Sequence, residues 1–135
     1  MGEVSDVFAA NEGDLVKEDL IVGVPAGLPV VRVTRLDPVK LGFLAEALGC
    51  SEVDALDAPV AMGPEGVPVV LPISPVLADR LAGLSEDDLE TVAADWAGGP
   101  VGLEGGEDGE EVVLRGLAEL AKSAGERRMY LWWAT

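Results

Sequence analysis

The last nine residues, Arg127-Arg128-Met129-Tyr130-Leu131-Trp132-Trp133-Ala134-Thr135 (RRMYLWWAT), contain three of the six aromatic residues in a chain of 135. Successive side chains of a strand point to opposite faces of a sheet, so Met129, Leu131 and Trp133 would share one face and Tyr130 and Trp132 the other. Both faces would be large and apolar, which is typical of a strand covered on both sides. The tail is therefore predicted to be a buried strand that closes the fold.

Four stretches before this tail combine helical spacing of apolar residues with recognisable ends. Residue types that cap a helix N-terminus occur at Asp37-Pro38, at Ser74-Pro75 and at Ser85 with Asp88. Gly49 and Gly125 can take the left-handed conformation that follows a helix. The sequence predicts helices over about 38–48, 75–83, 86–97 and 110–124, the last preceded by a glycine-rich acidic loop over 101–109.

The remaining apolar stretches indicate short strands. Strands are predicted over 3–9 and 30–34, and a loose hairpin over 59–73 in which Pro68 and Pro72 limit the second arm to an edge or a short strand. One helical turn is expected over 14–19, and a loop or irregular edge strand over 20–28. A chain of this length can bury one good core. We expect a single compact α+β domain over residues 1–135, with a small mixed sheet, about four helices and a buried C-terminal strand.

The charge balance restricts the partners. The chain has 25 acidic and 9 basic residues, a formal net charge of -16. A nucleic-acid-binding protein neutralises phosphates with Lys and Arg, and an anionic membrane surface would repel these carboxylates. A basic protein is the natural partner, and the alternative is that the acidity reflects a generally acidic proteome.

The sequence also restricts where in the cell the protein is expected and which catalytic or metal chemistry it could perform. The apolar uncharged run 20–31 is too short to span a bilayer, and residues Glu3 and Asp6 do not fit a secretory leader. Cys50 has no second cysteine to pair with. These features favour the cytoplasm and a structural thiol. The chain has no histidine, so the usual general base and imidazole metal ligand are missing, and no phosphate-loop spacing occurs. We expect no enzyme activity and no cofactor, although a catalytic pair of carboxylates stays a third alternative.

Two groups of carboxylates are candidate protein-binding residues. One lies at the start of the helix predicted over 86–97, and the other precedes or begins the helix predicted over 110–124. Their members are Asp87, Asp88, Glu90, Glu104, Glu107, Asp108, Glu110 and Glu111. The spacing of the second group does not match an EF-hand loop, so no metal site is predicted. Capping and a solvated surface are the alternative explanation, and if both groups lie on one side of the fold they would steer a basic partner.

An alternative site would be a pocket between the C-terminal strand and the helices, lined by Trp96, Tyr130 or Trp132, with burial in the core as the competing explanation. Arg127 and Arg128 are interpreted as a pair of charges at the entry to the strand. The leading hypothesis is a non-catalytic cytoplasmic protein that binds other proteins through an acidic surface, such as an inhibitor or immunity-type protein. The runner-up is a small-molecule-binding module with an aromatic-lined pocket.

The order of elements resembles the YfbM-like group of small proteins and its actinobacterial relatives. The resemblance is carried by an N-terminal strand ending in Phe8-Ala9-Ala10, by Leu36-Asp37-Pro38, by Trp96 and by the closing strand after Gly125. It implies a compact α+β domain. It brings no catalytic residue with it.

Overall fold

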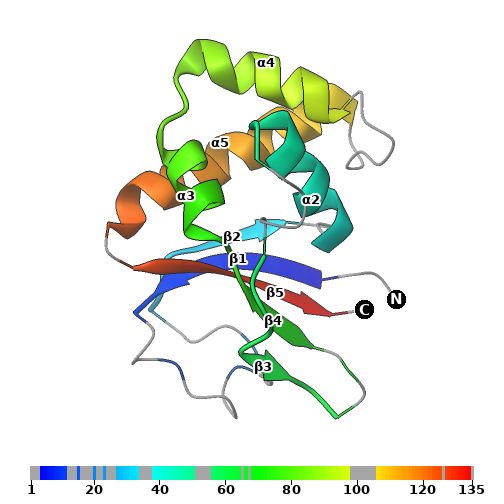
Figure 1. The fold of residues 1–135 in the computed structure, drawn as a ribbon, viewed down its shortest axis with the longest axis vertical. Coiled ribbons are helices and arrows are strands. Elements are labelled where there is room, and N and C mark those ends of the chain that lie inside the picture. Colours follow the sequence, from blue (N-terminus) through cyan, green and yellow to red (C-terminus); the bar gives the residue numbers. More distant parts are fainter. Residues whose placement is uncertain are drawn as a thin grey trace.

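The computed structural model describes residues 4–11, 15, 20, 23, 27–33, 38–50, 56–64, 66, 68–97, 106–125 and 127–134, and for residues 4, 32, 33, 38, 39, 97 and 106–110 the backbone alone. These residues form a single α+β domain of four helices and a five-stranded sheet (Figure 1). The predicted fold class is confirmed. The helical turn predicted over 14–19 and the irregular segment predicted over 20–28 lie largely outside the described residues.

The C-terminal strand occupies the centre of the sheet. The strands are β1 (Val4–Ala10), β2 (Val30–Val33), β3 (Ala61–Met62), β4 (Val69–Pro72) and β5 (Arg128–Ala134). Their order is β2-β1-β5-β4-β3, so β5 pairs with β1 on one side and with β4 on the other. The prediction of a buried C-terminal strand is confirmed.

The sheet is antiparallel at every pairing between the described strands, whereas the sequence predicts a mixed sheet. The physical reason lies in the connections. β3 and β4 form a hairpin, which produces an antiparallel pair, and a parallel pair requires a crossover that carries the chain back to the same end of the sheet. The chain between β4 and β5 passes through three helices and then enters β5 against the direction of β4.

β4 is short, as predicted, but it lies inside the sheet. Pro68 precedes this four-residue strand and Pro72 is its last residue. Proline lacks only the amide donor, and the Pro72 carbonyl still accepts a hydrogen bond from the Asp57 amide at 2.9 Å. Prolines at both limits therefore restrict the length of β4 without excluding it from the interior.

The helices gather on one face of the sheet (Figure 1). They are α2 (Pro38–Ala47), α3 (Pro75–Ala82), α4 (Glu86–Ala97) and α5 (Gly106–Ala124). α5 packs against β1, β2 and β5, whereas α4 packs on α5 and α2 and forms the outer layer. No helix among the described residues is long and apolar enough to cross a membrane.

The helix ends follow the capping chemistry of the sequence. The Ser74 hydroxyl accepts a hydrogen bond from the Val76 amide at 3.2 Å at the start of α3. Gly49 and Gly125, which follow α2 and α5, have positive φ angles of 82° and 61°. α5 begins at Gly106, four residues earlier than predicted, so the expected acidic loop over 101–109 is partly helical. Carboxylates favour a helix N-terminus and offset the low helix propensity of glycine there.

β5 separates two apolar clusters. The larger cluster lies between the sheet and the helices and includes Met129, Leu131 and, half-buried, Trp133. The smaller one lies on the opposite face and includes Tyr130, stacked on Phe8 with ring centroids 5.3 Å apart, and half-buried Trp132. The predicted alternation of the tail is confirmed.

Candidate functional site

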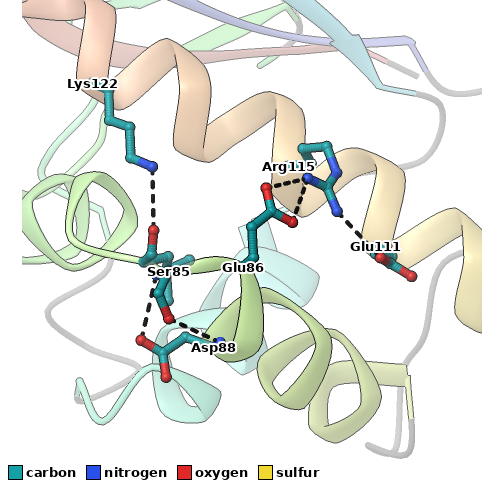
Figure 2. Close-up of polar contacts among 7 residues, drawn as sticks. Ser85, Glu86, Asp88, Glu111, Arg115 and Lys122 are labelled. Carbon is teal, nitrogen blue, oxygen red and sulfur yellow. Dashed lines mark hydrogen bonds and ion pairs between the residues drawn. The ribbon is translucent and has the colours of Figure 1, made fainter.

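The first turn of α4 is built from a reciprocal cap. The Ser85 hydroxyl accepts a hydrogen bond from the Asp88 amide at 3.2 Å, and the Asp88 carboxylate accepts one from the Ser85 amide at 3.4 Å (Figure 2). This is the capping box that the sequence predicts, with Asp in the place usually taken by Glu. Asp88 therefore has a structural role at the helix start.

Arg115 joins the two acidic groups of the sequence. Its guanidinium donates to both carboxylate oxygens of Glu86 on α4, at 2.7 and 2.8 Å, and to Glu111, one turn earlier on α5, at 3.4 Å (Figure 2). The start of α4 and the acidic part of α5 thus lie side by side. This contact was not predicted: the i, i+4 spacing of Glu111 and Arg115 is visible in the sequence, but Glu86 lies 29 positions away.

The ion pair also shifts the titration of both partners. The hydrogen bonds and the positive charge of Arg115 lower the pKa of Glu86 below its ordinary value. The same hydrogen bonds and the negative charge of Glu86 raise the pKa of Arg115. Both oxygens of the Glu86 carboxylate are held by Arg115, so the role that the structure shows for Glu86 is to join α4 to α5.

A second contact fixes the turn before α4. The Lys122 ammonium, near the end of α5, donates to the Leu84 carbonyl at 3.2 Å (Figure 2). Arg115 and Lys122 lie two turns apart on α5 and hold Glu86 and Leu84, so the start of α4 is attached to α5 at two points.

The inner side of α4 is anchored in the core. Leu89, Val92, Ala93 and Trp96 are buried, and the Trp96 indole donates to the Lys40 carbonyl of α2 at 3.1 Å. The opposite side of the helix is exposed and includes Asp87, Glu90 and Asp95. In the part of the chain that the structure describes, no cation forms an ion pair with these three carboxylates. We call Asp87, Glu90 and Asp95 the α4 acidic face.

The predicted protein-binding residues are therefore used in different ways. Asp88 caps α4 and Glu111 pairs with Arg115, whereas Asp87 and Glu90 are exposed on the α4 acidic face. Glu104 lies outside the described residues, and so do the side chains of Glu107, Asp108 and Glu110. Among the described residues, no group of three or more His, Cys, Asp and Glu side chains is arranged to hold a metal ion.

The three aromatic residues of the alternative pocket do not lie together. Trp96 belongs to the cluster under the helices, whereas Tyr130 and Trp132 belong to the cluster on the other face of the sheet. Trp96 and Tyr130 are each 1% exposed, and the Trp132 indole donates to the Leu20 carbonyl at 2.6 Å. These rings support the core on the two sides of β5 and do not bound one shared cavity.

Comparison with known proteins gives no match, whether to a protein-family model, to a curated protein or to a solved structure. The resemblance to the YfbM-like group stays a prediction. The function has to be inferred from the residues and geometry of this chain.

Proposed function

We propose that the protein is a non-catalytic binding module that recognises a basic protein through the α4 acidic face, as an inhibitor or immunity-type protein does. The observation that carries the proposal is that the acidic residues of α4 fall into two sets, one bonded within the fold and one exposed to solvent. Glu86 and Asp88 are engaged within the fold, while Asp87, Glu90 and Asp95 present uncompensated charge to solvent. An exposed field of one sign accelerates the approach of an oppositely charged protein.

Rigidity supports the same proposal. α4 is attached to α5 through Glu86 and Leu84 and to α2 through Trp96. A surface whose backbone is already fixed loses little conformational entropy on binding. The described part of the interface therefore fits recognition without folding of the helix.

The proposal is tested by affinity capture from a lysate of the source cells. Wild-type protein is compared with the double variant Asp87→Asn/Glu90→Gln and with a control, Glu46→Gln/Glu119→Gln, which removes two exposed carboxylates from α2 and α5. Both variants change the net charge equally. Captured proteins are identified at low salt and at about 0.5 M salt, where the Debye length is only about 4–5 Å.

We expect a basic protein that wild type and control retain at low salt, that the α4 variant loses, and that high salt releases. Equal loss in both variants would contradict a defined interface and would leave only a general charge effect. Retention by the α4 variant, or retention at high salt, would also contradict the proposal.

A further inference from the structure

A cavity of about 460 Å³ lies where α3, the C-terminal end of α5 and the start of β5 meet. This volume is within the range of small-molecule sites. The residues that line it come from three separate parts of the sequence. They are Ile73, Pro75, Ala78, Asp79, Ala82, Ala121, Lys122, Ala124, Gly125, Arg127, Arg128 and Met129. We call this cavity the α3–α5 groove.

Small side chains leave the groove open. Ala78 and Ala82 face it from α3, and Ala121 and Ala124 face it from α5. Larger apolar side chains at such positions would normally interdigitate and fill the space between two packed helices. Ile73 and Met129, each 1% exposed, lie beneath. The floor of the groove is therefore apolar and firmly supported.

The rim has the opposite charge to the rest of the molecule. Lys122, Arg127 and Arg128 are three of the nine Lys and Arg residues in the chain, whereas Asp79 is one of 25 acidic residues. Among the charged residues that line a cavity placed at random on so acidic a protein, carboxylates would be the majority. The groove thus combines an apolar surface with a local excess of positive charge.

Two of the three cations are held in position and the third is available. Arg128 donates to the Ile73 carbonyl at 3.4 Å and forms an ion pair with Asp57. Lys122 uses one of its three donors on the Leu84 carbonyl. Within the described part of the chain, the Arg127 guanidinium forms no hydrogen bond or ion pair, and Arg127 is an exposed residue of the groove lining.

We propose that the α3–α5 groove binds a small organic anion that has an apolar body and a carboxylate or phosphate group. The apolar body packs on the alanines and on Ile73 and Met129, and the anionic group is bound by Arg127 and Lys122. Arginine matches both carboxylate and phosphate through paired N–H donors, which is why the two groups belong to one ligand chemistry. A long polyanion is disfavoured by the net charge of -16.

The groove is separate from the α4 acidic face, since none of its lining residues is Asp87, Glu90 or Asp95. The two proposals can therefore fail independently. Loss of anion binding leaves capture of a basic protein unaffected, and the reverse also holds.

The test is a titration of ¹⁵N-labelled protein, followed by amide chemical shifts, with phenyl phosphate, benzoate, inorganic phosphate, benzyl alcohol and benzylamine. We expect phenyl phosphate and benzoate to shift the amides of residues 121–129 saturably. Arg127→Gln should weaken this binding about tenfold, the loss of one charge-assisted contact. The control Arg80→Gln removes an equal charge from α3 outside the groove and should change the affinity less than about twofold.

Ala78→Leu, which fills the groove, should remove the binding of both anions while thermal unfolding shows that the variant remains folded. If Ala78→Leu does not fold, Arg127→Gln and Arg80→Gln decide the matter alone. Equal binding of benzyl alcohol or benzylamine would overturn the proposed charge selectivity, and equal binding of inorganic phosphate would overturn the role of the apolar floor. Equal weakening by Arg80→Gln and Arg127→Gln, or no shifts at residues 121–129, would overturn the assignment of the site.

Discussion

The two halves of α5 support surfaces of opposite charge. Towards its start, Glu111 and Arg115 join the acidic first turn of α4, and at its end Lys122 stands with Arg127 and Arg128 around the α3–α5 groove. Glu111 and Lys122 are about 16 Å apart along the axis of α5, about twice the Debye length of roughly 8 Å at physiological salt. A net charge of -16 therefore describes neither surface by itself.

The two regions also differ in how their charges are used. At the acidic end, carboxylates cap α4 and pair with Arg115, and the carboxylates without such a role are exposed to solvent. At the basic end, alanines leave a cavity and one arginine has no partner among the described residues. The first arrangement suits contact with another surface, and the second suits enclosure of a small ligand.

The largest loss of unfolding free energy is expected from a change in the core of α5, the helix that supports both regions. Leu117 of α5 is fully buried, so Leu117→Ala should lower the free energy of unfolding by about 2–5 kcal/mol. Val112→Ala on the same helix is the control: Val112 is 71% exposed, and its truncation should change the unfolding free energy by less than about 0.5 kcal/mol. Urea unfolding measures both. Similar losses for the two variants would contradict the packing of α5 described here.

A smaller loss of unfolding free energy is expected when the cap at the start of α4 is removed, and this change should be confined to the acidic region. Ser85→Ala removes the hydroxyl that accepts from the Asp88 amide, and it should lower the unfolding free energy by about 0.5–2 kcal/mol. The matched change Ser123→Ala removes a hydroxyl that donates within α5 to the Leu120 carbonyl, and it should have an effect below about 0.5 kcal/mol. Amide chemical shifts should change around residues 84–88 and not at residues 127–129 of the groove. A Ser85 variant as stable as wild type would contradict the capping role.

The smallest effect concerns the titration of Glu86. Its pKa is lowered by Arg115, so the pair stabilises the fold at pH values above the ordinary carboxyl pKa, and this contribution is lost as the pH falls through the lowered value. Arg115→Gln should return the Glu86 pKa towards its ordinary value, as followed by carboxyl ¹³C NMR. Arg80→Gln should leave the titration nearly unchanged. An unaltered Glu86 titration in Arg115→Gln would show that the pair does not persist in solution.

Much of the fold could be predicted because its signals are local. The capping box of Ser85 and Asp88, the Ser74 cap, the turn at Gly125 and the alternation of β5 each depend on residues within a few positions of one another. The antiparallel order of the sheet and the earlier start of α5 were not predicted. Both depend on how distant segments pack and on competing local preferences, which one short window of sequence does not determine.

The candidate sites were predicted less completely. The exposed positions of Asp87 and Glu90 follow from the helical repeat, but the pairing of Glu86 with Arg115 joins two helices. Arg127 and Arg128 were interpreted as charges at the strand entry, whereas Arg128 pairs with Asp57, 71 positions away. The α3–α5 groove combines residues from 73–82 with residues from 121–129, and no spacing rule relates two such segments.

The most direct test of the central claim is to map two probes of opposite charge on ¹⁵N-labelled wild-type protein. A tetralysine peptide should shift amides of residues 86–95 and lose this effect at about 0.5 M salt, whereas phenyl phosphate should shift amides of residues 121–129. We expect two separate sets of affected residues. Overlapping sets, or shifts spread evenly over the surface for either probe, would contradict the division of the molecule into the α4 acidic face and the α3–α5 groove.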